Sequence, residues 1–299
     1  MTKQSQKMPP KVARLFAMLT AAYPGLTWQS YRYIDEGWDH EVLILDEQLV
    51  FRFPDDEEYT NKLKSEISIL GYLKDRVPVR VPDYTYVPVN KNFAGYALVP
   101  GEQLLAPYLQ TLPRGDYKEI VKQLAGFLSA IHTQDLAQSI FREVSSSYLE
   151  EDQKALKQQA ATNLKQALSA KDFALVEEII VEVDELVVQK LPQVFIHNDV
   201  YSRHLLWDAK NRKLGVIGFN DMCIGDPAVD FAELYEYGAA FVKAVFDQYT
   251  GPQDDTFLER AWIYQKWVGV YMMADHFETP KITFEEARET FDRIKITPR

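Results

Sequence analysis

The chain has very little cysteine and too little positive charge to neutralise a polyanion. Cys223 is the single cysteine among 299 residues, so no disulfide can form within the chain. This composition is typical of a reducing compartment, and we expect a cytoplasmic protein. The net charge is -11, from 33 Lys and Arg against 44 Asp and Glu. Because nucleic-acid binding depends on clustered cations, we expect no nucleic-acid partner.

Long apolar runs are also missing from the sequence. The apolar stretch at residues 12–22 is interrupted by Arg14, while Leu15, Leu19 and Ala22 recur at helical spacing. This spacing predicts a short amphipathic helix rather than a signal peptide. No run approaches the ~18 apolar residues of a membrane span, so we expect no membrane partner. With 46% hydrophobic residues, the chain is expected to fold as a globular monomer with a large core.

Strand-like segments dominate the first hundred residues. β-Branched and aromatic residues between turn residues predict strands at 28–34, 41–45, 49–53, 81–87 and 95–99. The first three of these are expected to form a small antiparallel sheet. Apolar residues at spacings of three and four predict an amphipathic helix at 57–73.

Helical patterns dominate after residue 101. Helices are predicted at 117–134, over the charged stretch 146–170 and from 229 onward, with short strands at 194–197, 204–207 and 213–217 between them. This change of pattern predicts an α+β protein of two lobes with a cleft between them. We expect a β-rich lobe at residues 1–100, a hinge at about 97–103 and a helical lobe at 104–299.

A polar cluster follows the predicted strand at 194–197. The strand would hold His197-Asn-Asp199 rigidly at its end, which makes Asp199 a positioned carboxylate. His204 begins the next apolar run, and its imidazole can form hydrogen bonds or bind a metal ion. A loop of this length can bring a base and a ligand to face one point.

These segments resemble the antibiotic phosphotransferases of the aminoglycoside and macrolide kinase type. The pattern His-x-Asp-x-x-x-x-His at 197–204 carries the resemblance, together with the two strands that follow it and Gly-Asp-Pro-Ala-Val-Asp at 225–230. Further similar segments lie at residues 36–42, 50–54, 63–67 and 93–99. The catalytic-loop pattern is specific, whereas the Gly37 loop alone would be weak. The aminoglycoside 2''-phosphotransferases, which also have His where protein kinases have Asn, are the most similar branch.

The resemblance implies a protein-kinase-like fold with a small β-rich N-lobe and a larger helical C-lobe. It implies a phosphotransferase that uses ATP or GTP with Mg²⁺ to phosphorylate a hydroxyl of a small molecule, such as a cationic antibiotic. Asp199 would be the catalytic base or orienting carboxylate, and Arg52 would bind nucleotide phosphates while paired with Glu66. The other residues that the resemblance assigns are Gly37, Tyr96, Leu98 and Val99 for the nucleotide, and His204 for the metal ion.

Each of these polar residues also has a structural interpretation. Asp199 could cap a turn, and His204 could be structural because Mg²⁺ prefers oxygen ligands. Glu66 could pair with a lysine one turn away on a solvated helix face. We expect Asp230 to cap or brace the helix that follows it, and His132 to brace the core.

The sequence departs from the family pattern at one position of the predicted metal site. The family has a metal-binding aspartate near the end of the second hairpin strand, where this chain has Gly218. Asp221 could supply the missing charge, or the glycine could replace an aspartate natural to this chain. Alternatively, the protein is a catalytically impaired kinase-fold protein that binds nucleotide or a small molecule without efficient turnover. Arg52 in place of the family's lysine is a milder departure.

The sequence leaves the acceptor open between two classes of antibiotic. A polycationic aminoglycoside would need carboxylates, and the candidates are Asp275, Glu278, Glu233 and Glu236. A macrolide carries one amine on a large apolar body and would need aromatic residues, and the candidates are Trp262, Tyr264, Trp267 and Tyr271. These aromatic residues also suit a hydrophobic core.

Overall fold

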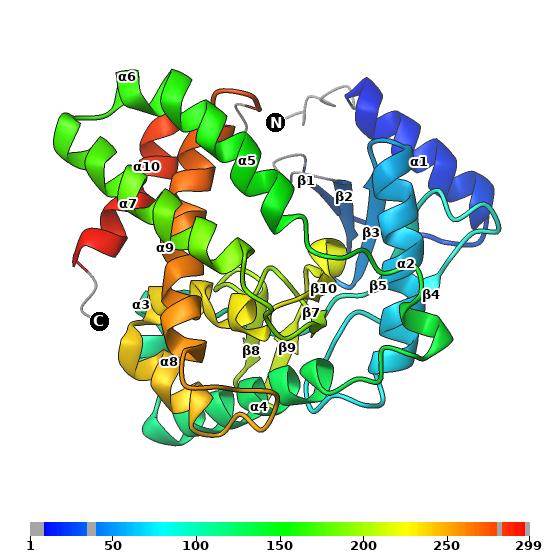
Figure 1. Ribbon diagram of the computed structural model, residues 1–299. Coiled ribbons are helices and arrows are strands. Elements are labelled where there is room, and N and C mark those ends of the chain that lie inside the picture. Colours follow the sequence, from blue (N-terminus) through cyan, green and yellow to red (C-terminus); the bar gives the residue numbers. More distant parts are fainter. Residues whose placement is uncertain (1–8, 35–39, 280–282, 297–299) are drawn as a thin grey trace. The chain divides into compact units, whose positions relative to one another are not determined.

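A computed structural model of the chain describes residues 9–34, 40–279 and 283–296 (Figure 1). The chain divides into two compact units. The first unit comprises Met1–Gly71 and Pro82–Leu98, and the second comprises Tyr72–Val81 and Val99–Arg299. Each unit buries its own hydrophobic cluster. The expected α+β class, strand-rich first and helix-rich second, is confirmed.

A five-stranded antiparallel sheet, in the order β1-β2-β3-β5-β4, forms the centre of the first unit. The elements of this unit are α1 (Pro10–Ala22), β1 (Tyr31–Ile34), β2 (His40–Leu45), β3 (Leu49–Pro54), α2 (Glu57–Leu73), β4 (Tyr84–Tyr86) and β5 (Ala94–Ala97). The helix predicted at 57–73 is confirmed at both ends.

Two predicted strands are shorter in the structure than in the sequence-based assignment. β1 starts only at Tyr31, because the carboxylate of Asp46 accepts hydrogen bonds from the backbone N–H groups of Gln29 and Ser30. β4 is limited to three residues between Pro82 and Pro88. A proline has no N–H to donate to a sheet, which explains why this strand does not extend further.

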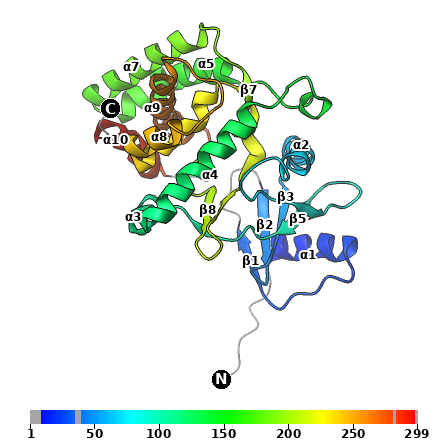
Figure 2. The same cartoon turned by 90° about the horizontal axis from the view of Figure 1, so that it is seen from below.

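The two faces of this sheet have different chemistry. Phe51 and Phe53 of β3 and Leu43 of β2 pack with α1 in one apolar cluster, and Figure 2 shows α1 alongside these strands. Because side chains alternate along a strand, Arg52 points to the opposite face. Val42 of β2 directly opposes Arg52 in the β2–β3 register, so its side chain lies on the same face as Arg52. His40 is two residues before Val42 and therefore lies on this face too.

The second unit is mainly helical and contains two small antiparallel sheets, β6-β8-β9 and β10-β7. Its strands are β6 (Glu102–Gln103), β7 (Val194–Ile196), β8 (Leu205–Asp208), β9 (Lys213–Val216) and β10 (Cys223–Gly225). Its α-helices are α3 (Ala106–Thr111), α4 (Arg114–His132), α5 (Leu149–Gln159), α6 (Lys165–Ala167), α7 (Ala170–Val187), α8 (Ala239–Phe246), α9 (Phe257–Asp275) and α10 (Phe284–Ile296). Shorter helical turns are η1 (Ser139–Phe141), the π-helix η2 (Ala160–Leu164), η3 (Phe219–Asp221), η4 (Pro227–Phe231) and η5 (Glu233–Tyr237).

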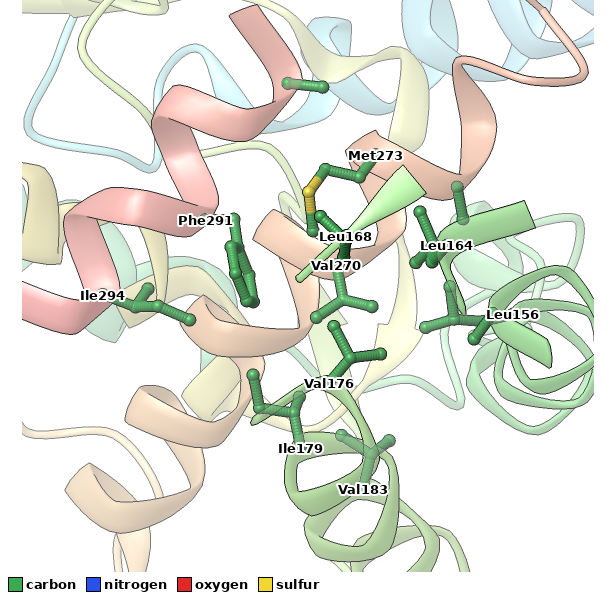
Figure 3. Close-up of a cluster of buried hydrophobic side chains, with 13 residues drawn as sticks. Leu156, Leu164, Leu168, Val176, Ile179, Val183, Val270, Met273, Phe291 and Ile294 are labelled. Carbon is green, nitrogen blue, oxygen red and sulfur yellow. The ribbon is translucent and has the colours of Figure 1, made fainter. Parts of the chain in front are cut away.

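Helices α5, α7, α9 and α10 meet around one apolar cluster of the second unit (Figure 3). Labelled members from these helices are Leu156, Val176, Ile179, Val183, Val270, Met273, Phe291 and Ile294. Helices α9 and α10 approach closely because Gly269 has no side chain. A Cβ atom at this position would lie 3.0 Å from the Cα atom of Phe291.

In the part of the chain that the structure describes, no helix is both long and apolar enough to cross a membrane.

A buried ion pair attaches α9 to the segment that follows β10. Nε of Arg260 lies 2.7 Å from Oδ2 of Asp226, and the two side chains are only 2% and 3% exposed. Tyr264 donates a further hydrogen bond to Asp226 over 3.1 Å. Tyr264 therefore belongs to the core and not to an acceptor site, which corrects one of the aromatic candidates.

Replacing Arg260 by leucine should strongly destabilise the protein. The substitution would leave the Asp226 carboxylate buried without its cation, which typically costs about 3–5 kcal/mol of unfolding free energy. Arg32→Leu is the control, because the ion pair of Arg32 with Glu47 is 53% and 62% exposed. Its loss should cost no more than about 1 kcal/mol in chemical denaturation. Equal losses from the two substitutions would contradict the role assigned to the buried pair.

Candidate functional site

The turn after β7 is fixed by the buried carboxylate of Asp230. Its Oδ2 accepts a hydrogen bond from the backbone N–H of His197 over 2.9 Å, and its Oδ1 accepts one from Asn198 over 2.7 Å. Asn198 has a φ of 66°, a left-handed conformation that asparagine tolerates better than most residues. The carboxylate thus fixes the sharp turn that leads to Asp199.

Asp230 is itself held by a buried histidine. Nε2 of His132 lies 2.9 Å from Oδ2 of Asp230, and its Nδ1 lies 2.8 Å from the hydroxyl of Tyr249. Burial opposes ionisation of Asp230, but hydrogen bonds and charge from His132, together with the N–H of His197, lower its pKa overall. His132 braces this region as expected. The interpretation of Asp230 as a brace for the following helix is wrong, because its side chain holds the loop that precedes it.

His197 connects the turn to the end of the β8–β9 hairpin. Its Nδ1 accepts the backbone N–H of Asp199 over 3.2 Å, so the proton of the neutral ring is on Nε2. Nε2 donates to the carbonyl of Ile217 over 3.0 Å. Burial lowers the pKa of His197, which keeps the ring neutral and this tautomer fixed.

Asp199 and His204 converge in the structure. Nδ1 of His204 lies 3.0 Å from the backbone oxygen of Asp199 and 3.1 Å from its Oδ2. Both contacts are to acceptors, so Nδ1 carries a proton and donates it toward Asp199. The two side chains remain partly exposed, at 21% for His204 and 29% for Asp199. This pair therefore combines a fixed position with access for a reactant.

The His204 ring packs directly on Gly218. Gly218 has a φ of 84°, and a Cβ atom added there would lie 2.4 Å from both Cε1 and Nδ1 of His204. Glycine is thus favoured at this position for two reasons: the backbone is left-handed, and a side chain would have to displace the His204 ring. The site differs from one in which a carboxylate has simply been removed, because an imidazole lies where that side chain would begin.

The residues around Gly218 do not fit the family arrangement for magnesium. Position 218 offers no side-chain oxygen, and Mg²⁺ requires oxygen ligands in near-octahedral geometry. Nowhere in residues 9–34, 40–279 and 283–296 are three or more His, Cys, Asp or Glu side chains arranged to hold a metal ion. Asp221 lies at the end of η3. A metal-binding role for His204 and Asp221 stays a prediction.

In the first unit, Arg52 and Glu66 form a buried ion pair. Nη1 of Arg52 lies 2.6 Å from both carboxylate oxygens of Glu66, whose side chain is fully buried. Tyr84 joins the pair, accepting from Arg52 over 2.9 Å and donating to Glu66 over 3.0 Å. Lys62 instead lies 3.6 Å from Glu58. The alternative in which Glu66 pairs with a lysine on the helix surface is therefore wrong.

The other predicted nucleotide-binding residues have separate environments. Tyr96 is buried against Tyr84 with ring centroids 5.0 Å apart, and burial raises its pKa to about 12. The backbone N–H of Leu98 donates to the carbonyl of Gln48 over 2.7 Å, so a purine contact through this N–H would break that bond. Val99 is buried in the second unit. Gly37 lies outside the described residues.

Two glutamates of η5 lie close to the Asp199 loop. Glu236 accepts hydrogen bonds from the backbone N–H of Ser202 and, over 2.8 Å, from its hydroxyl. Glu233 is half-buried, and burial followed by the charges of Asp199, Glu236 and Asp230 raises its pKa well above the usual range. Such a concentration of carboxylates is stabilised by an added cation.

An aromatic pair lies beside a second group of carboxylates. Trp267 and Tyr271 of α9 are stacked, with ring centroids 4.9 Å apart. Burial and then the charges of four carboxylates raise the pKa of Tyr271 to about 12. These are the carboxylates of Asp152, Asp275, Asp221 and Glu278. Sequence analysis missed Asp152, because a charged helix surface gives no signal that distinguishes one of its carboxylates.

Gly218→Asp should lower stability and should not increase turnover. A non-glycine residue in a strained backbone conformation costs about 1–3 kcal/mol, and the new Cβ atom would also displace the His204 ring. The same substitution in a His204→Ala background should cost less, because the ring is gone. Chemical denaturation of the four proteins of this double-mutant cycle measures the coupling. Additive losses, or a stable and more active single variant, would contradict the packing described here.

Comparison with known proteins gives one match by sequence and several by structure. The model of a family described as "Phosphotransferase enzyme family" (APH) matches residues 30–262. The GDP and kanamycin complex of APH(2")-IIIa has a TM-score of 0.83 at 22% identity, covering 94% of this chain and 98% of that one. For the streptomycin-ATP ternary complex of APH(2")-IIa the TM-score is 0.68 at 19% identity, with 97% and 99% covered.

A macrolide enzyme shares the same fold. Macrolide 2'-phosphotransferase MphH from Brachybacterium faecium, as the apoenzyme, has a TM-score of 0.66 at 16% identity, covering 93% of this chain and 98% of that one. The resemblance to aminoglycoside and macrolide phosphotransferases, and with it the kinase-like fold, is confirmed. Identities this low establish the fold and do not identify the acceptor.

Proposed function

The chain belongs to the phosphotransferase enzyme family, and from this premise we propose that it phosphorylates a hydroxyl of a small cationic molecule. One observation carries the choice of acceptor: Glu233 and Glu236 gather beside Asp199, where burial and then the charges of these neighbours raise the pKa of Glu233. A carboxylate cluster of this kind favours a ligand with one or more amines. Aminoglycosides, and macrolides with their single amine, are the acceptor classes that fit.

Asp199 is the proposed catalytic base. The His204 N–H contacts Oδ2 of Asp199, which orients the carboxylate and leaves Oδ1 as the oxygen that we assign to the acceptor hydroxyl. Asp199 takes the hydroxyl proton as the acceptor oxygen bonds to the γ-phosphorus. The bond from that phosphorus to the bridging oxygen breaks, and the nucleoside diphosphate leaves. Positioning of the reactants supplies much of the acceleration in this chemistry.

The proposed phosphoryl donor is ATP or GTP. Solved structures with the same fold contain GDP, ADP or ATP, which supports a nucleotide but does not choose the base. In this chain Arg52 is the proposed phosphate-binding cation, since Glu66 and Tyr84 fix one end of its guanidinium. Participation of Mg²⁺ is a further part of this proposal. The proton transfer assigned to Asp199 does not involve a metal ion bound by residue 218.

A second candidate function follows from the packing of His204 on Gly218. If phosphoryl transfer in this chain needs a carboxylate at that position, the protein binds nucleotide and a small molecule without efficient turnover. The loss of one such charge-stabilising group typically costs several kcal/mol in the transition state. The two candidates predict the same ligands and differ in turnover.

An Asp199→Asn variant should separate catalysis from binding. The amide cannot accept the hydroxyl proton, so turnover should fall about 10²–10⁴-fold while nucleotide binding persists. Product formation is measured with ATP or GTP, Mg²⁺ and a panel of aminoglycosides and macrolides. Wild-type turnover in the variant would contradict the role of Asp199. A wild-type protein that nucleotide stabilises against heat, but that phosphorylates none of the panel, would favour the second candidate.

Binding of a cationic acceptor should release a proton from Glu233. The raised pKa means that free Glu233 keeps its proton to higher pH than an ordinary glutamate, whereas a bound ammonium favours the ionised form. Affinity should therefore rise with pH up to the pKa of the free protein and level off above it, while the ligand amine stays protonated. Calorimetry in buffers of different ionisation enthalpy measures the released proton. Glu233→Gln is the control, and equal proton release in this variant would exclude Glu233 as the source.

A further inference from the structure

His40 is a buried polar side chain on the Arg52 face of the first unit's sheet. It begins β2 and is only 6% exposed. Nη2 of Arg52 lies 3.3 Å from Nδ1 of His40. The Tyr59 ring of α2 lies on another side, with ring centroids 6.0 Å apart. His40 therefore contacts the residue proposed to bind nucleotide phosphates, from a neighbouring strand.

The contact with Arg52 fixes the tautomer of His40. A guanidinium has only donors, so Nδ1 must accept this hydrogen bond and the ring proton must be on Nε2. Burial, followed by the charges of Arg52 and Lys62, lowers the pKa of His40 to about 2. The ring is therefore neutral throughout the physiological pH range, and its Nε2–H is a permanent hydrogen-bond donor.

This donor has no acceptor in the part of the chain that the structure describes. Nε2 of His40 is buried and makes no hydrogen bond to any described residue. A buried donor without a partner destabilises the protein, which is a reason to look for a ligand. Glu66, the buried carboxylate that pairs with Arg52, is already engaged by Arg52 and Tyr84. Among the described residues no acceptor remains for Nε2, and a bound ligand is the candidate that the experiments below test.

The surroundings favour an acceptor with negative charge. Arg52 and Lys62 act on His40 as positive charges, and their carboxylate partners are Glu66 at 2.6 Å and Glu58 at 3.6 Å. The guanidinium fork of Arg52 has donors besides the Nη1 group that Glu66 and Tyr84 contact. A phosphate can accept from a guanidinium and an imidazole at once, because it has several oxygens.

We propose that the Nε2–H of His40 donates a hydrogen bond to a phosphate oxygen of the bound nucleotide, next to the contact made by Arg52. His40 is then a positioning residue whose ring has two roles. Nδ1 accepts a hydrogen bond from Arg52 and orients it, and Nε2 donates a hydrogen bond to the phosphate. This inference rests on the proposed function, since it assumes that a nucleoside triphosphate binds at Arg52. Its chemistry distinguishes nucleotides from nucleosides, which have no phosphate to accept this bond.

Three substitutions separate the two ring nitrogens. His40→Asn places an amide near Nδ1 and keeps the contact with Arg52, but it loses the distal donor. His40→Gln places an N–H near Nε2 and keeps the donor. His40→Leu loses both groups. The affinity for ATP, GTP and their diphosphates is measured by calorimetry, with the nucleosides and inorganic phosphate as further ligands, and circular dichroism checks the fold of each variant.

The Leu and Asn variants should bind nucleotides about tenfold more weakly or worse, because a hydrogen bond to a charged group is lost. The Gln variant should retain most of the nucleotide affinity. Nucleoside binding should be unchanged in all three variants. The losses of nucleotide affinity should be the same at pH 6 and pH 8. Weakened binding of inorganic phosphate would support a phosphate contact independent of the base. Rescue by Asn instead of Gln, or equal nucleotide affinity in all variants, would overturn the inference and leave the proposed function intact. A wild-type protein that binds no nucleotide would overturn both.

Discussion

The geometry of the candidate site depends on one buried carboxylate. Asp230 satisfies the backbone N–H groups of His197 and Asn198 with its two oxygens, and a buried histidine holds it in place. Without these bonds, two backbone donors and a charge would be buried without partners, and the left-handed turn at Asn198 would have nothing to maintain it. The position of Asp199, one residue further on, follows from this arrangement.

Both units stabilise buried charge in the same way, by giving each ionised group several partners at once. Glu66 receives a guanidinium and a phenol, Asp226 receives a guanidinium and a phenol, and Asp230 receives an imidazole and two backbone N–H groups. The contacts of Asp226 with Arg260 and of Asp230 with His132 join segments 34 and 98 residues apart in the sequence. The side chains proposed to contact reactants are thus supported by several partners each, which is what positional catalysis requires.

Local patterns predicted the parts of the site that depend on nearby residues. Local patterns predicted the helix of Glu66, the strand of Arg52 and a loop that lets Asp199 and His204 face one point, while the pairing of Arg52 with Glu66 was implied by the family resemblance. The structure brings each pair together. The sequence could not predict contacts made across long separations. Pairing of β10 with β7, the direction of the Asp230 side chain and the packing of an imidazole on Gly218 all depend on tertiary structure. No local propensity encodes them.

The stacking of His204 on Gly218 also constrains how this sequence can change. Restoring an acidic residue at position 218 requires a backbone conformation that suits glycine and space that the imidazole occupies. A single mutation would meet both obstacles, so a carboxylate at this position requires the His204 ring to move from the place it has in this chain. That histidine also contacts Asp199, so moving the ring would disturb the contact that orients the proposed catalytic base.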